Sequence, residues 1–145
     1  MPSFVGRPAD LAISGALVAL KLWVPESVTA ERTRQAKPVV PPIDTLAEVD
    51  TGAMHTIIQE GVATSLGLDP VGTTKITTVT TPVYECYLYR IQLLFPQGCT
   101  AEILAIEAPY IIRPNARTKC LIGRDILKHS LLIYNGLTNM FSLIF

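Results

Sequence analysis

The chain has 145 residues, of which 49% are hydrophobic and only 17% are charged. This length and composition favour a single globular domain with a substantial core, and they argue against intrinsic disorder. Twelve Lys and Arg residues balance twelve Asp and Glu residues. Zero net charge gives no electrostatic basis for nucleic acid or an anionic membrane as the main partner. It also leaves little self-repulsion, which suits a subunit that associates with a second copy.

Three cysteines, Cys86, Cys99 and Cys120, are widely spaced and odd in number. This pattern fits neither a disulfide framework nor the Cys-x-x-Cys spacing of a zinc site. We therefore expect a reduced, cytoplasmic protein without a metal, although one bridge between two of the cysteines stays open. The apolar run 11–20 lacks a small-x-small cleavage site, so we interpret it as mature structure, and we expect no membrane span.

The first half of the chain alternates between irregular and extended patterns. Residues 1–14 contain Pro2, Gly6 and Pro8 and are predicted to form an irregular N-terminal arm. Apolar side chains then recur with period two, which predicts a half-buried strand ended by Pro25. One face of this strand carries Val18, Leu20, Leu22 and Val24, and the other carries Ala19, Lys21 and Trp23. Residues 26–44 are charged and end in prolines, which predicts a surface insertion loop with one short helical turn near 28–35.

The second half is rich in residues that favour strands. We predict strands at 45–49, 56–58, 73–79, 83–95, 99–107 and 119–122, and short helices at 60–66 and 125–130. Segments 131–134 and 139–145 flank Asn135-Gly136, a strong hairpin signal. The chain then ends in a very apolar strand. We expect its exposed edge to pair with another chain, because natural proteins seldom leave such an edge open.

Asp50-Thr51-Gly52-Ala53 is the motif around which the chain is organised. It places a carboxylate at the end of the apolar strand 45–49, where burial is costly unless the acid is hydrogen-bonded, paired or functional. Thr51 offers a hydroxyl that both donates and accepts, and Gly52 allows another backbone to approach. By itself, Asp-Thr-Gly is common in ordinary turns, so its flanking residues must decide its meaning.

The flanking residues resemble the active-site loop of retropepsin-like aspartic proteases, which reads hydrophobic-Asp-Thr/Ser-Gly-Ala with a further Thr. Here the segment is Val49-Asp50-Thr51-Gly52-Ala53-Met54-His55-Thr56. A second block, Leu121-Ile122-Gly123-Arg124-Asp125, is similar to the family's other signature of two apolar residues, Gly-Arg-Asn/Asp and a short helix. The resemblance covers roughly residues 15–145. It implies an all-β, single-lobed acid protease fold with one or two short helices, in one domain spanning 1–145.

Hydrolysis of a peptide bond by carboxylates needs one acid to protonate the carbonyl and one base to activate water. The chain has one Asp-Thr-Gly, and its other aspartates lack that setting. The expected site is therefore a dyad of two Asp50 residues in a homodimer, which is also how the resembling family builds its site. No cofactor is implied, and the expected substrate is a polypeptide.

The resemblance also implies roles around Asp50. Thr51 would hold the two loops together across the dimer axis, Ala53 would line the cleft, and Gly123 and Arg124 would support the site. The candidates for the substrate cleft are Met54, His55, Val79, Thr80, Thr81 and Ile122. Family members have a mobile flap that often carries glycines, whereas residues 73–95 contain none. Acids that often follow the Ala are replaced here by Met54 and His55.

These departures motivate an alternative, a catalytically inactive module that keeps the fold and dimerises or binds peptides. A third reading is an ordinary β domain in which Asp50 only caps a turn. The sequence contains two histidines, His55 and His129, and neither has the neighbours of a metal site or of a Ser-His-Asp arrangement.

Overall fold

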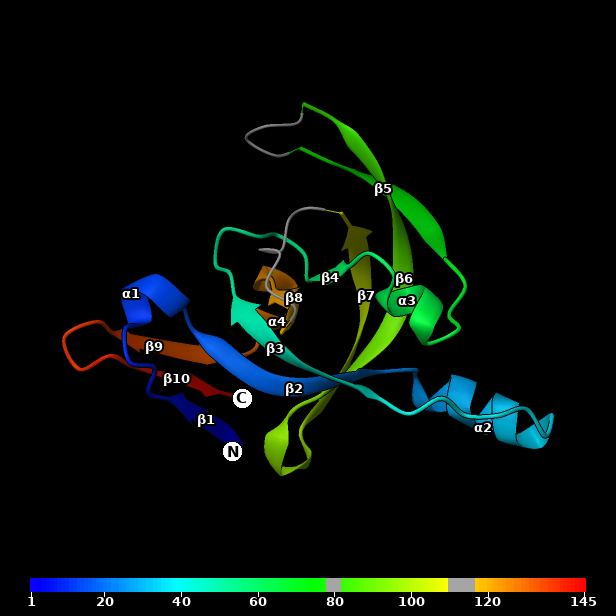
Figure 1. Cartoon of the computed structure of the whole chain (residues 1–145), viewed down its shortest axis with the longest axis horizontal. Coiled ribbons are helices and arrows are strands. Elements are labelled where there is room, and N and C mark those ends of the chain that lie inside the picture. Colours follow the sequence, from blue (N-terminus) through cyan, green and yellow to red (C-terminus); the bar gives the residue numbers. More distant parts are fainter. Residues whose placement is uncertain (78–81, 110–116) are drawn as a thin grey trace.

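A computed structural model describes residues 1–77, 82–109 and 117–145 of the chain. Within these ranges it consists mostly of strands with a few short helices, so the predicted all-β class is confirmed (Figure 1). The elements in chain order are β1 (Ser3–Gly6), α1 (Leu11–Ser14), β2 (Leu17–Trp23), α2 (Glu26–Arg34), β3 (Ile43–Val49), β4 (Ile57–Gln59), α3 (Val62–Ser65), β5 (Gly72–Ile76), β6 (Tyr84–Leu94), the 3-10 turn η1 (Pro96–Gly98), β7 (Thr100–Ala108), β8 (Thr118–Ile122), α4 (Arg124–Leu127), β9 (Leu131–Asn135) and β10 (Met140–Ile144).

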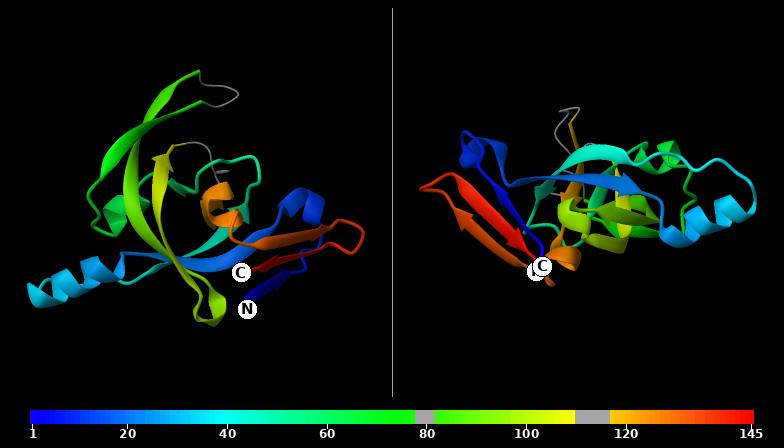
Figure 2. Two further views of the ribbon diagram at one scale, coloured as in Figure 1. Left: turned by 180° about the vertical axis from the view of Figure 1, so that it is seen from behind. Right: turned by 90° about the horizontal axis from the view of Figure 1, so that it is seen from below.

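The described strands form two sheets. The main sheet has seven strands in the order β2-β3-β8-β4-β7-β6-β5, and β2 also pairs with β6, so the sheet curls back on itself. The terminal sheet has the order β1-β10-β9. Figure 2 shows the terminal sheet beside the main sheet, with the two chain ends next to each other. A hydrogen bond of 3.1 Å from the amide of Phe145 to the carbonyl of Pro2 joins these ends.

The principal core lies between the curled main sheet and the terminal sheet. The predicted inward face of β2 is confirmed, because Val18, Leu20, Leu22 and Val24 are all buried. Three rings tie the two sheets together: Phe95 packs against Phe4 with a centroid separation of 5.6 Å and against Phe145 at 5.0 Å. Removing such a quantity of apolar surface from water is the main favourable contribution to folding.

A second, smaller apolar cluster covers part of the opposite face of the main sheet. It consists of Ile57, Cys86, Ile106, Ala108 and Leu121. Strand β6 serves both clusters, since Cys86 belongs to the smaller one while Tyr89, Ile91 and Leu93 belong to the principal core. The centre of the main sheet is therefore covered by apolar side chains on both faces.

The N-terminal arm is ordered, contrary to the irregular structure predicted for residues 1–14. Strand β1 pairs antiparallel with β10, and Phe4 is buried in the principal core. Asp10 then caps α1, since its Oδ1 accepts hydrogen bonds from the amides of Ala12 and Ile13. The prediction was wrong because β1 is stabilised by a partner about 140 residues away in the chain, which no local pattern reveals.

Residues 26–44 lie on the surface as expected, but they are not mainly a loop. Nine of them form α2, which has no buried residue, and β3 already begins at Ile43. Arg32 anchors this helix, because its guanidinium donates to the carbonyls of Leu66 and Gly67 after α3. The prolines at 38, 41 and 42 lie after α2, in the connection to β3. The helix depends on contacts with residues far along the chain, which no local pattern reveals.

The hairpin at the C-terminus is confirmed, but its turn and its edge differ from the prediction. Residues 136–139 form the connection, and Asn139, not Gly136, adopts a left-handed φ of 51°. The Asn139 side chain accepts a hydrogen bond of 2.9 Å from the amide of Leu11. Strand β10 is the central strand of its sheet, so the expected open edge of the last strand does not exist. The edge strands there are β1 and β9.

Other features bear on the expectations from composition. None of the described helices is long and apolar enough to cross a membrane. The three cysteines are free thiols, with Cys86 and Cys120 buried and Cys99 partly accessible. Burial raises the pKa of the Cys86 and Cys120 thiols above their ordinary value.

Thiol labelling tests this arrangement. Because the thiolate is the reactive form and burial opposes it, native protein at pH 8 should react with a disulfide reagent first at Cys99. Cys86 and Cys120 should react only at the rate of unfolding, and in denaturant all three should react quickly. Peptide mapping of the labelled protein identifies the site. Fast native labelling of Cys120 would contradict the buried position of β8.

Candidate active site

Asp50 follows the last residue of β3 at the centre of the main sheet. Strand β8 lies between β3, to which it is parallel, and β4, to which it is antiparallel. The segment 50–56 joins β3 to β4 and so passes over the end of β8. The amide of Asp50 donates a hydrogen bond of 3.0 Å to the carbonyl of Ile122, the last residue of β8. The carboxylate is thus placed by the strand order as well as by its own turn.

The turn itself fixes one oxygen of the Asp50 carboxylate. Oδ1 accepts hydrogen bonds from the amide of Gly52 at 2.8 Å and from the amide of Ala53 at 3.3 Å. The Asp50 carbonyl accepts a further bond of 3.3 Å from the Ala53 amide, which closes the turn. Within the described part of the chain, Oδ2 has no such donor. Asp50 is half-buried, whereas Thr51 and Gly52 are exposed, so the turn presents the carboxylate toward solvent.

The second motif packs directly on the segment that follows Asp50. The amide of Arg124 donates to the carbonyl of Ala53 at 2.9 Å, and the amide of Asp125 donates to that of Met54 at 3.2 Å. Gly123 makes this approach possible. A Cβ at this position would lie 2.8 Å from the amide nitrogen of Thr56 and closer still to the carbonyl group of His55. The sequence prediction that Gly123 supports the site therefore has a steric basis.

Thr56 and Asp125 form a polar link that sequence reasoning missed. Asp125 accepts a hydrogen bond of 2.7 Å from the Thr56 hydroxyl and one of 2.9 Å from the Thr56 amide. The same hydroxyl accepts a bond of 3.1 Å from the amide of Gly123. Thr56 is completely buried, so each of these groups needs its partner. The sequence offered one signal for this link. Thr56 lies six residues after Asp50 in the first motif, and Asp125 lies two residues after Gly123 in the second.

The structure places the remaining predicted residues as follows. Met54 is 64% exposed and His55 is also exposed, beside the Asp50 turn. Arg124 is exposed, and within the described residues its side chain has no acid partner. Val79, Thr80 and Thr81 lie outside the described residues.

Ile122 was predicted to line the cleft, and this prediction was wrong. Its side chain is fully buried in the principal core, where it cannot meet a substrate. Adjacent residues of a strand point to opposite faces, so Leu121 instead joins Ile57 in the smaller cluster on the other face. The motif Leu121-Ile122 gives two apolar residues, but only the sheet determines which of them faces the core.

Within the described ranges, no group of three or more His, Cys, Asp or Glu side chains is placed to hold a metal ion. The cavities bounded by described residues lie away from the Asp50 turn. One of them, a wide surface hollow of about 890 Å³, is lined by β2, β3 and residues 94–96, 117 and 119.

The sequence matches no family model and no curated protein. The solved structures that resemble the fold include the following two. A retropepsin-like aspartic protease from Rickettsia conorii has 14% sequence identity and a TM-score of 0.47, with 98% of this chain and 92% of that chain covered. The retroviral protease-like domain of Ddi1 from Leishmania major has 12% identity and a TM-score of 0.44, with 83% of this chain and 82% of that chain covered. At such values the likeness is distant, and any chemistry has to be argued from this chain's own residues.

Gly123→Ala should disturb the junction between the two motifs. A methyl group at this position meets the backbone of residues 55 and 56, which cannot move without shifting the Asp50 turn. We expect a loss of about 1–3 kcal/mol in the free energy of unfolding, measured with urea. Gly72→Ala is the control, because a Cβ there would make only an ordinary contact of 3.9 Å with the Leu88 side chain. Equal stability of the two variants would contradict the close approach.

Thr56→Val removes one hydroxyl but keeps the volume. Asp125 then loses an O–H donor, and the Gly123 amide loses its acceptor, in a place without water access. The expected cost is about 1–3 kcal/mol in the free energy of unfolding. Thr73→Val on the exposed edge strand β5 is the matched control and should change stability by less than about 0.5 kcal/mol. Thermal or urea unfolding of both variants measures the difference.

Proposed function

We propose that the chain is an aspartic endopeptidase that hydrolyses polypeptides with a dyad of two Asp50 residues, one from each subunit of a homodimer. The observation that supports this most strongly is the carboxylate at the end of β3. One of its oxygens is held by the amides of Gly52 and Ala53, and the loop carrying it is fixed to α4 by backbone hydrogen bonds. An acid held in this way by one oxygen, with its other oxygen not engaged by the turn, is positioned for acid–base chemistry.

The chemistry requires a second carboxylate at the same place. Two carboxyl groups close together do not both ionise readily, so one retains a proton and can donate it to the scissile carbonyl. The other accepts a proton from water, and the water oxygen attacks the carbonyl carbon. Asp125, the nearest acid in the second motif, is occupied by Thr56 and by its own helix. The second carboxylate is therefore assigned to Asp50 of another copy.

The terminal sheet offers a surface for that copy. Its outward face carries Val5, Leu131 and Ile133, which are 59%, 57% and 48% exposed. Val5 and Ile133 are both opposite Ser142 on the central strand, so these side chains share one face. Exposed apolar side chains grouped in this way are typical of a protein interface. In Figure 1 the terminal sheet and the loop after β3 lie on the same side of the molecule.

The proposed roles of the residues next to Asp50 follow from the solvent exposure of their side chains. Thr51 is exposed next to Asp50 and is free to meet the same residue of a partner loop across a two-fold axis. Ala53, Met54 and His55 continue along the surface and are proposed to contact the substrate. Gly123 and Arg124 position the loop through their backbone, as described above.

Cleavage of a diverse peptide library between pH 4 and pH 7 tests this proposal. We expect Asp50→Asn to lower the rate of cleavage by at least about a thousandfold, because the substituted amide can neither carry the shared proton nor accept one from water. Asp69→Asn, at an exposed position outside the turn, should keep wild-type activity. Circular dichroism and sedimentation show whether each variant is folded and dimeric.

Two outcomes would contradict the proposal. If wild type and Asp50→Asn cleave equally, the activity belongs to another site or to a contaminant. If a folded, dimeric wild type cleaves nothing, the inactive peptide-binding or dimerisation module becomes the better description, for which the exposed Met54 and Arg124 provide motivation.

A further inference from the structure

Glu48 is a charged residue in an otherwise apolar row that crosses the main sheet. The residues paired in register across the neighbouring strands β2, β3, β8, β4 and β7 form this row: Leu17, Glu48, Leu121, Ile57 and Ile106. The last three belong to the smaller apolar cluster. A carboxylate among apolar side chains loses part of its hydration, so its position asks for a partner or a function.

Glu48 and Asp50 lie on the same face of the main sheet. Ala47 and Val49 contact the principal core, so Glu48 between them points to the opposite face. Asp50 follows two residues later, and its amide continues the pairing of β3 with β8 through the carbonyl of Ile122. Two residues of a strand span about 7 Å. Glu48 is therefore a neighbour of the carboxylate to which we assign the chemistry.

The Glu48 side chain leans toward the end of the strand where Asp50 lies. The amide of Val49 donates to the carbonyl of Ala16 at 2.8 Å, so Gly15, the residue before Ala16, lies beside Asp50. A Cβ on Gly15 would be only 2.8 Å from Oε1 of Glu48. The missing side chain at Gly15 thus leaves the space in which the Glu48 carboxylate lies.

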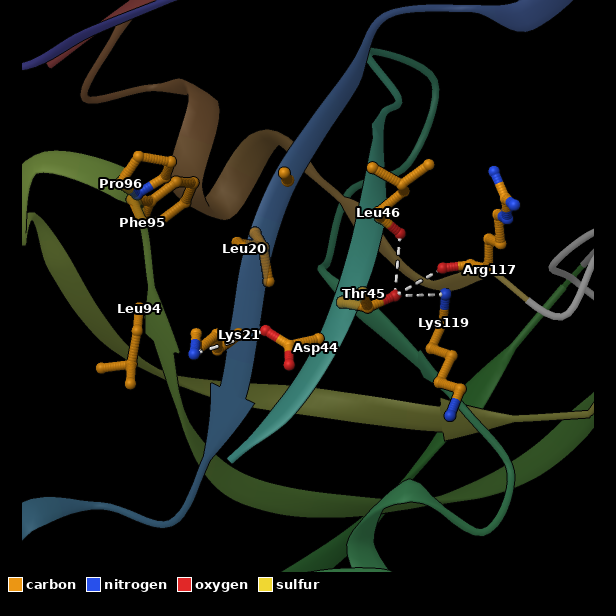
Figure 3. Close-up of a pocket in the computed structure, with 11 residues that line it drawn as sticks. Leu20, Lys21, Asp44, Thr45, Leu46, Leu94, Phe95, Pro96, Arg117 and Lys119 are labelled. Carbon is orange, nitrogen blue, oxygen red and sulfur yellow. Dashed lines mark hydrogen bonds and ion pairs between the residues drawn. The ribbon is translucent and has the colours of Figure 1, made fainter. Parts of the chain in front are cut away.

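Within the described part of the chain, the Glu48 carboxylate has no ion-pair or hydrogen-bond partner, and Lys119 on the neighbouring strand does not pair with it. Asp44, further back on the same face of β3, differs in this respect. It pairs with Lys21 at 3.4 Å, and Figure 3 shows the two side chains facing each other. Glu48 is half-buried but keeps contact with water. A cation placed there would gain a charge-assisted hydrogen bond without displacing an internal partner.

We propose that Glu48 selects polypeptides that carry a Lys or Arg side chain next to the cleaved bond. This inference rests on the proposed function, because it takes the Asp50 turn as the place where a polypeptide binds. A Lys or Arg side chain matches the row, since its alkyl stem can pack against Leu17 while its cationic head meets Glu48. A two-fold axis between the subunits places one Glu48 on each side of the bond. The preference is therefore expected within two residues of the bond, on both sides.

Cleavage of a peptide library by the wild-type protein should enrich Lys and Arg at these positions. The best-cleaved Lys peptide is then compared with the same peptide carrying norleucine, which keeps the alkyl stem and removes the charge. We expect kcat/KM to be at least about tenfold higher for the Lys peptide. In Glu48→Gln this ratio should fall to about one, and Glu48→Lys should prefer Glu at the same position.

Asp44→Asn is the matched control. It removes one negative charge from the same face of the same strand, about 13 Å from Glu48, and should keep the wild-type ratio of Lys to norleucine cleavage. Circular dichroism and sedimentation show that each variant has the fold and the oligomeric state of the wild type.

Binding to the Asp50→Asn variant separates recognition from catalysis. The same library, arrayed on a surface, should retain this variant best on peptides with Lys or Arg, and the added substitution Glu48→Gln should remove that preference. If wild type cleaves nothing while this binding preference is seen, the peptidase proposal fails and the role of Glu48 stands. If wild type cleaves through Asp50 without the preference, or if Glu48→Gln leaves the preference unchanged, the role of Glu48 is overturned and the peptidase proposal stands. Neither cleavage nor preferential binding would overturn both.

Discussion

The close contact between two backbone segments, one after Asp50 and one at Gly123, is the constraint on which the candidate site depends. The carbonyls of Ala53 and Met54 accept hydrogen bonds from the first amides of α4, and a side chain on Gly123 would prevent this approach. Hydrogen bonds between Thr56 and Asp125 stabilise the same junction. As a result, the Asp50 turn is held by α4 and β8 as well as by its own hydrogen bonds, and the carboxylate has a fixed position without being buried.

The two aspartates of the motifs differ in role: Asp125 supports the structure, and Asp50 is the proposed catalytic residue. Asp125 is satisfied inside the protein, where its hydrogen bonds hold two elements together. Asp50 uses one oxygen for its turn, and within the described residues its other oxygen accepts no hydrogen bond from a backbone amide. Under the proposed function, Asp50 would be one half of an acid–base pair, and the apolar outer face of the terminal sheet, with Val5, Leu131 and Ile133, would bind the copy that brings the second half. The proposed catalysis therefore requires that two copies of the chain associate.

The main sheet carries apolar side chains on both of its faces. Its centre is covered on both faces, by the principal core on one side and by the smaller apolar cluster on the other. Beyond the smaller cluster, the strands β2 and β3 leave an open face with Lys21, Asp44 and the nearby Lys119. Asp44 and Leu46 on this face belong to β3, the strand that ends immediately before Asp50.

The sequence alone determined the local elements and the two motifs. Period-two burial identified β2, and the order of Asp50-Thr51-Gly52 and Gly123-Arg124 indicated a retropepsin-like acid protease fold, because such patterns depend on neighbours in the chain. Only the tertiary structure decided that β1 pairs with β10, that Ile122 faces the core and that Asp125 bonds Thr56. These features join residues far apart in sequence, and their energies come from packing and hydrogen bonds that exist only once the strands are assembled.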